Sequence, residues 1–254
     1  MEIWECAVYN TKLLENPYEF LFNEKSEEST VDTYILPKVS VPSLTRLGFF
    51  HSKMQDSDIR EFLKVNTGLK TLSIKPECIN LVGELTALKN LRLDGFTCFQ
   101  ESTQVPTIES IEKLEITGFE LDIINANVFS LLCPNLIEFK LNSELDYFQG
   151  TIDQFLVPLL SSLKMLKTLI LNIEGIDDRL NINELNQMET LRLSLSSIAI
   201  LNLDFESCGN LKKIVLSTTT DPVNTKKFRE KFSNYKNWKF EFSERFVRGY
   251  KLIN

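Results

Sequence analysis

Histidine and glycine are scarce in this sequence, and their scarcity removes several kinds of catalytic site. His51 is the single histidine, so any Ser-His-Asp or Cys-His arrangement would depend on it. No G-x-S-x-G phrase surrounds a serine. The nine glycines are never closer together than 12 residues, so no glycine-rich loop is present to cradle a phosphate. The sequence therefore predicts a protein that is not an enzyme and that uses no cofactor.

Clustered cysteines and metal-binding spacings are missing as well. The carboxylates Glu174, Asp177 and Asp178 lack the alternating oxygen spacing of a calcium loop, so we interpret them as a solvated turn. Disulfide frameworks and zinc clusters both need closer grouping of cysteines than this chain has. The sequence thus predicts no metal site and reduced, mostly buried thiols, as is typical of a cytoplasmic or nuclear protein. The cysteines are Cys6, Cys78, Cys98, Cys133 and Cys208.

No apolar run approaches the roughly 20 residues that a membrane-spanning helix needs. The first residues, MEIWECAVYN, carry Glu2 and Glu5 where a signal peptide would be basic and then apolar. The chain has 28 Lys and Arg against 35 Asp and Glu, a net charge of −7, which favours solubility and argues against general affinity for nucleic acid. We therefore expect neither a membrane nor a nucleic acid as partner.

The sequence does contain a repeated phrase of the form L-x-x-L-x-L. Its clearest copy is ALKNLRLDGF, where Leu88, Leu91 and Leu93 occupy the three apolar positions, which we name the anchors. The phrase fits the chain nine times, and successive first anchors are 19 to 30 residues apart. The anchors are Leu44/Leu47/Phe49, Leu69/Leu72/Ile74, Leu88/Leu91/Leu93, Ile111/Leu114/Ile116, Leu136/Phe139/Leu141, Leu166/Leu169/Leu171, Met188/Leu191/Leu193, Leu211/Ile214/Leu216 and, more weakly, Tyr235/Trp238/Phe240.

The anchor spacing predicts one short strand in each copy. The second and third anchors are two residues apart, so both point to the same face of a strand. One strand cannot bury that face alone, whereas stacked copies pair their strands in parallel and bury a common core. Copies near a period of about 20–29 residues are typical of leucine-rich repeats. We predict an α/β fold: a single right-handed leucine-rich-repeat solenoid, a horseshoe arc of about nine irregular repeats with parallel strands on the concave face.

The repeat pattern also predicts how the chain is divided. Residues 1–43 fit the pattern poorly and are predicted to form an N-terminal cap or degenerate first repeats. Residues 44–220 form the leucine-rich repeats, and residues 221–254 form the last repeat and a C-terminal cap. The segment 226–251 holds nine Lys or Arg and three Asp or Glu. We interpret it as a solvated helix over an aromatic cap, with contact to an acidic partner or RNA as the alternative.

Two stretches go beyond the general repeat. LLCPNLIEFKL and SCGNLKKIVL place Cys133 and Cys208 just before Asn-Leu and a predicted strand. From about residue 44 to residue 242 the chain thereby resembles the F-box/leucine-rich-repeat proteins and the wider ribonuclease-inhibitor-like class. The resemblance implies a non-enzymatic protein–protein interaction module, the substrate-recognition part of an F-box-like ubiquitin ligase. It implies a Skp-type adaptor as partner only if an F-box is present outside this chain.

The chain departs from that family in two respects. No F-box phrase is found, since Leu36 and Pro37 are followed by KVSVPSL. The alternative is therefore a stand-alone scaffold or inhibitor solenoid with no ubiquitin connection. The ninth position of each copy forms no asparagine ladder, and we predict that Phe96 and Phe119 there point inward as an aromatic column. His51 is predicted to lie on an exposed rim.

In each copy, the residue between the second and third anchors and its alternate neighbours are predicted to point off the concave surface. Over nine copies these positions hold eight cations and four anions, so an acidic protein carries positive charge where solenoids bind. We predict that this face binds an acidic or phosphorylated segment of a protein partner, with Arg92 and Arg192 as forked donors. The alternative is that long basic side chains simply suit an exposed parallel sheet. The predicted contact residues are Arg46, Phe50, Arg92, Lys113, Lys140, Arg192, Lys213 and Lys239.

Overall fold

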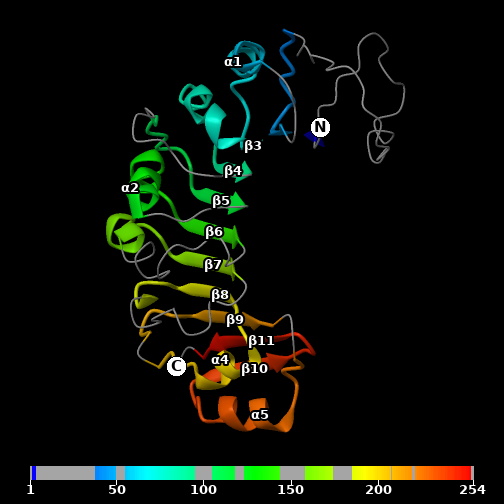
Figure 1. The fold of residues 1–254 in the computed structure, drawn as a ribbon, viewed down its shortest axis with the longest axis vertical. Helices are drawn as coiled ribbons and strands as arrows, with labels where there is room; N and C mark the ends of the chain where they lie inside the picture. Colours follow the sequence, from blue (N-terminus) through cyan, green and yellow to red (C-terminus); the bar gives the residue numbers. More distant parts are fainter. Residues whose placement is uncertain are drawn as a thin grey trace, which may run out of the picture.

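The strands of this protein form one continuous sheet. The computed structural model describes residues 2–3, 38–49, 55–94, 105–117, 123–143, 158–173, 185–206, 208–218 and 221–252. Within these ranges the sheet has 11 strands, in the order β1-β2-β3-β4-β5-β6-β7-β8-β9-β11-β10. Figure 1 shows the strands stacked along the length of the molecule, with α1 and α2 to one side of them.

Strands β2 to β9 come one from each successive turn of the solenoid, and β10 and β11 form an antiparallel pair at its end. The strands are β1 (Glu2–Ile3), β2 (Arg46–Gly48), β3 (Thr71–Ile74), β4 (Asn90–Asp94), β5 (Lys113–Thr117), β6 (Glu138–Ser143), β7 (Thr168–Ile173), β8 (Thr190–Ser194), β9 (Lys213–Ser217), β10 (Trp238–Phe242) and β11 (Phe246–Lys251). The connections carry α1 (Asp56–Val65), the 3-10 helix η1 (Pro76–Leu81), α2 (Ile123–Leu132), α4 (Ser197–Asn202) and α5 (Lys226–Ser233). Residues 158–162, before β7, are also helical.

The anchors lie in register through the stack. Strands β1 to β9 pair in parallel, and each second anchor pairs with the second anchor of the next strand, as Leu72 does with Leu91 and Leu91 with Leu114. All anchors of the first eight copies are buried. The prediction of buried anchors is therefore confirmed for these copies, and the architecture is that of an α/β repeat solenoid.

A second row of backbone contacts fixes where each strand starts. Just before each strand from β3 to β9, two successive N–H groups donate to one carbonyl of the preceding turn. Lys89 and Asn90, for example, both donate to the Lys70 oxygen, each at 2.9 Å. The first residues of these pairs form a row across the turns, which we name the strand-start row. Its members are Lys70, Lys89, Glu112, Ile137, Lys167, Glu189 and Lys212.

The connecting segments close the core on the anchor side. On α1, Ile59, Phe62 and Leu63 are buried in the same cluster as the anchors. On α2, the Phe129 ring lies 6.3 Å, centroid to centroid, from the ring of the anchor Phe139. The helices thus cover the anchor face, and the other face of the sheet is left for contacts with solvent or a partner.

The prediction that the ninth copy stacks in parallel on the eighth is wrong. β11 lies between β9 and β10 in the sheet and pairs antiparallel with both. The side chains of Trp238 and Phe240 lie on the anchor side, packed against the core and only partly buried. β1 extends the sheet beyond β2 at the other end. The assignment of 1–43 and 221–254 to caps stays a prediction.

Several predicted features lie outside the described residues. They are the aromatic column of Phe96 and Phe119, the rim residue His51, the contact residue Phe50, the acidic turn at 174–178, and Cys6 and Cys98.

Candidate functional site

The face of the sheet opposite the anchors is the candidate site, and we name it the open face. Parallel registry places its side chains in rows that run across the strands. The middle row, from β3 to β9, reads Ser73, Arg92, Glu115, Lys140, Ile170, Arg192 and Val215. Antiparallel pairing adds Arg248 of β11 beside Val215 and Glu241 of β10 beside Arg248.

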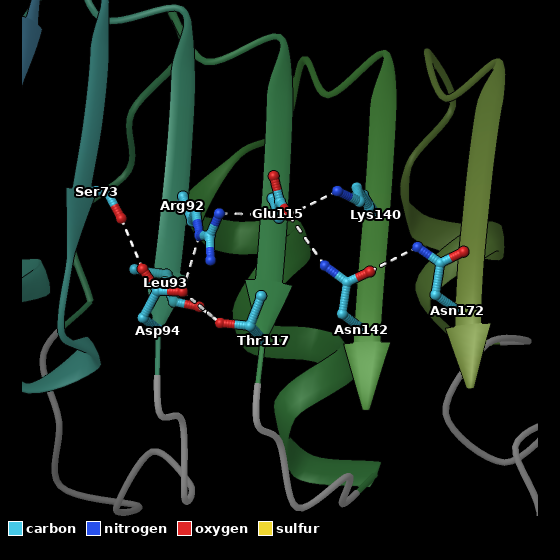
Figure 2. A network of polar contacts seen from close by, with 9 residues as sticks. All are labelled: Ser73, Arg92, Leu93, Asp94, Glu115, Thr117, Lys140, Asn142 and Asn172. Atoms are coloured by element: carbon cyan, nitrogen blue, oxygen red, sulfur yellow. Dashed lines mark hydrogen bonds and ion pairs between the residues drawn. The ribbon is translucent and has the colours of Figure 1, made fainter. Parts of the chain in front are cut away.

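In the half of the open face formed by β3 to β6, the charged groups are paired with one another (Figure 2). Asp94 is the acceptor for three donors on three strands. The Ser73 hydroxyl donates to it at 2.7 Å, the Arg92 Nε–H donates at 2.8 Å, and the Thr117 hydroxyl also donates. Because its three donors come from β3, β4 and β5, this carboxylate joins these strands. One of the donors, Ser73, is buried.

Glu115 is the second acceptor in this half. Its Oε1 lies 2.7 Å from the Lys140 Nζ and accepts from the Asn142 amide at 2.9 Å. The same oxygen lies 3.9 Å from Arg92 Nη1. The chain of contacts continues as the Asn172 amide donates to the Asn142 Oδ1 at 2.6 Å (Figure 2).

A further ion pair completes the neutralisation. Lys113 lies 3.1 Å from Glu138 across β5 and β6. Strands β4 to β6 therefore place three cations on the open face, Arg92, Lys113 and Lys140, against the three anions Asp94, Glu115 and Glu138. Like pairs in exposed positions stabilise by only about 0–1 kcal/mol each, but they leave this half electrically balanced.

The other half of the open face, from β7 to β11, is not balanced. Arg192 is exposed between Ile170 and Val215, its neighbours in register, and within the described residues it makes no ion pair. Lys213 lies over the Tyr250 ring, 5.8 Å from its centroid. These contacts hold the two cations beside apolar and aromatic surface, and no carboxylate of the described ranges forms an ion pair with them.

β11 adds to this imbalance. Arg248 lies over the Phe246 ring at 5.1 Å and 3.8 Å from Glu241, and its buried Nε has no hydrogen-bond partner. With Lys239, this half carries four cations and the single anion Glu241 in the described part of the chain. Phe246, Arg248 and Tyr250 were missed from sequence, although the alternation in FVRGYK is the signal that marks them.

Six of the eight predicted contact residues are thus sorted between the two halves. Arg92, Lys113 and Lys140 lie in the balanced half, and Arg192, Lys213 and Lys239 lie in the unbalanced half. Of the other two, Arg46 is exposed at the start of β2, and Phe50 is outside the described residues.

The described cysteines lie in the connections between strands and not on the open face. Cys78, Cys133 and Cys208 are buried thiols that take no part in a disulfide. Burial raises the pKa of the Cys133 thiol well above its ordinary value, so this group stays neutral. Such a thiol behaves as a packing group and is a poor nucleophile.

The C-x-N-L phrases have a structural explanation. The Leu136 N–H donates to the Cys133 oxygen at 3.2 Å, and the same turn recurs where Leu88 donates to Leu85 at 3.1 Å, with leucine in place of cysteine. The Asn135 amide donates at 3.1 Å to the Glu109 oxygen of the preceding turn, and Asn210 makes the equivalent bond at 3.2 Å to Asn186. The phrase therefore describes how successive turns stack, and it carries no information about a partner.

Two searches of the described residues concern other kinds of site. They contain no group of three or more His, Cys, Asp or Glu side chains placed to hold a metal ion. Among the helices in these ranges, none combines the length and the apolar character that crossing a bilayer requires.

No protein-family model matches the chain, and no curated protein matches it. Among solved structures it is similar to an internalin (inlF) from Listeria monocytogenes str. 4b F2365, at a TM-score of 0.32 and 16% sequence identity. The match covers 66% of this chain and 53% of the internalin chain, so it spans about half of that protein. A likeness of this degree carries no argument about function, which must come from the residues themselves.

Proposed function

We propose that the protein is a non-enzymatic protein–protein interaction module, and that it binds an extended acidic segment of a partner along the open face between β7 and β11. The observation that carries the proposal is the charge balance. Strands β4 to β6 match each cation with a carboxylate, whereas Arg192, Lys213, Lys239 and Arg248 face the single anion Glu241 among the residues that the structure describes. A face that has not neutralised its own cations is suited to carboxylates or phosphates from another chain.

The surroundings of Arg192 support the same site. Ile170 and Val215 flank it in register, so both of its neighbours in the middle row are apolar. An ion pair formed beside apolar surface is less screened by water and salt than one in open solvent. Tyr250 and Phe246 add flat aromatic surface, which is common in protein interfaces. A partner with acidic or phosphorylated residues next to apolar ones would therefore match this half.

The balanced half has a different role in this proposal. For Arg92, Lys113 or Lys140 to contact a partner, each would have to leave a carboxylate of the same sheet. We propose that these three residues hold neighbouring strands in register. Of the six sequence-predicted contact residues that lie in the two halves, this proposal retains Arg192, Lys213 and Lys239, and it adds Arg248.

A role as the substrate-recognition part of an F-box-like ubiquitin ligase is suggested by the C-x-N-L phrases. These phrases are explained by the stacking of successive turns, so they give that role little support. A stand-alone scaffold or inhibitor needs no further component. Co-purification with a Skp-type adaptor distinguishes the two. We also propose a cytoplasmic or nuclear location, which the three buried thiols outside any disulfide support.

The proposed function is tested with poly-glutamate as a defined acidic probe and poly-lysine as its counterpart. Arg192→Gln/Lys213→Gln removes two uncompensated cations, and Lys113→Gln/Lys140→Gln, the matched control, removes two paired ones. The first variant should weaken poly-glutamate binding about fivefold to tenfold and flatten its salt dependence. The control should bind about as well as the unmodified protein. Equal losses in both variants, or preference for poly-lysine, would refute this assignment.

A further inference from the structure

A cleft opens at the edge of the sheet where β7, β8 and β9 begin, apart from the open face. Its volume is about 570 Å³. It is lined by the turns that precede these three strands and by the end of β11, which runs antiparallel and so finishes at the same edge. We name it the strand-start cleft. Its polar lining residues are Lys164, Lys167, Gln187, Glu189, Asn210, Lys212 and Lys251.

The charges in the strand-start cleft are four lysines and one glutamate. Glu189 lies 3.2 Å from the Lys167 ammonium and 2.7 Å from that of Lys212. Lys251 donates at 2.8 Å to the Gly209 carbonyl, and Lys164 makes no ion pair within the described residues. One carboxylate therefore serves two lysines, and the described residues that line the cleft carry a net charge of +3.

This surplus is largest at the cleft. In the same strand-start row nearer the N-terminus, Lys70 and Lys89 stand with Glu112, which lies 2.6 Å from Lys89, so the excess there is one positive charge against three in the cleft. The effect of the surplus on Glu189 is direct, because hydrogen bonds from Lys212 and then Lys167 lower the pKa of its carboxyl. An acidic protein of net charge −7 thus concentrates ammonium groups from four separate chain positions around one concave space.

We propose that the strand-start cleft is a binding site for a phosphate-class oxyanion. The excess of three positive charges suits a dianion or a more highly charged group better than a single carboxylate. Lysine binds phosphate as a compact point charge and reaches it on a flexible stem. Two amide side chains tie the cleft walls to earlier turns. Gln187 donates to a backbone carbonyl of an earlier turn at 3.0 Å, and Asn210 does so at 3.2 Å. The site is distinct from the open face and is independent of the function proposed for that face.

The test titrates the full chain with inorganic pyrophosphate and with orthophosphate, using chloride at matched ionic strength as the reference. Calorimetry gives the dissociation constant, and the backbone amide resonances of Gly209 and Asn210 report where the anion lies. Lys164→Gln/Lys212→Gln should weaken pyrophosphate binding about tenfold, since each exposed charge contributes a few-fold. Lys70→Gln, at the equivalent strand-start position of β3 and outside the cleft, is the matched control and should have no effect.

A third variant moves the result in the opposite direction. Glu189→Gln removes the internal competitor and frees Lys167 and Lys212, so pyrophosphate binding should tighten about threefold. A purely structural role for Glu189 would predict no gain. The proposal is overturned if neither anion binds saturably at low ionic strength. It is also overturned if Lys70→Gln weakens binding as much as the double variant, or if Glu189→Gln weakens binding.

Discussion

The insertion of β11 between β9 and β10 depends on Gly249, and Gly249→Ala tests it. Gly249 pairs with Ile214 of β9 on one side and with Phe240 of β10 on the other. A Cβ at this position would lie 2.5 Å from the Phe240 Cε1 and 3.0 Å from the Ile214 Cγ2. Carbon atoms without a bond between them prefer about 3.5–4.0 Å, so one of these neighbours would have to move.

The Phe240 ring has little room to move. Its centroid lies 4.8 Å from that of Phe232 and 6.0 Å from those of Trp238 and Tyr235. Overpacking of this kind costs about 1–3 kcal/mol. Replacing glycine restricts the unfolded chain and returns about 0.4–1 kcal/mol. The free energy of unfolding should therefore fall by about 1–2 kcal/mol.

Urea unfolding followed by tryptophan fluorescence measures this change. Gly68→Ala is the control, because a Cβ there would have no atom within 4 Å, and its stability should stay within about 0.5 kcal/mol. Gly249→Ala/Phe240→Leu should lose less than the sum of the two single changes, since the smaller side chain makes room for the methyl group. Unchanged stability in Gly249→Ala, or simple additivity in the double variant, would show that β11 is not held against Phe240 as described.

Two further predictions concern single polar groups. Burial, followed by the nearby Asp204 and Glu206 carboxylates, raises the pKa of Tyr235 to about 12, so the folded state favours the neutral phenol. The contribution of Tyr235 to stability should be constant below about pH 10 and fall as the pH rises toward 12, by at most about 2.7 kcal/mol. This alkaline slope should be absent when the unfolding of Tyr235→Phe is measured as a function of pH. Asp94→Ala should lower the free energy of unfolding by about 2–3 kcal/mol because three donors lose their acceptor. Asp94→Asn should lower it by about 1 kcal/mol, since the two hydroxyls can reverse their hydrogen bonds but the Arg92 N–H cannot. Equal melting curves for these two variants would contradict this explanation.

The core of the fold could be predicted from sequence because it depends on one repeated physical requirement. Every turn must place two apolar side chains two residues apart on the same face, or its strand cannot join the stack. Leucines such as Leu91 and Leu93 therefore mark β4 without knowledge of its neighbours. The connections need only cover that face, and many sequences do so, which is why η1 and α4 carry no comparable pattern.

The end of the stack could not be predicted in this way. Tyr235, Trp238 and Phe240 satisfy the anchor spacing, and their strand does form, but periodicity says nothing about which strand will be its neighbour. β11 follows β10 after a short connection and can pair along both its edges, so it takes the place beside β9. Gly249 was the residue that permitted this, and a glycine inside an alternating strand is a signal of close backbone or ring approach.

Counting charges along the open face gave the correct sign but the wrong distribution, because a count ignores register. Lys140 and Glu115 are 25 residues apart in sequence and 2.7 Å apart in space. Once neighbours are known, β4 to β6 are balanced and a surplus of cations lies at the β7–β11 end, where basic residues divide between two surfaces. Lys212 lines the strand-start cleft, and the next residue, Lys213, lies on the open face. Lys251 and Tyr250 divide in the same way. A few-fold weaker binding of pyrophosphate in Lys212→Gln with poly-glutamate binding intact, and the reverse in Lys213→Gln, would therefore establish two sites that adjacent residues keep separate.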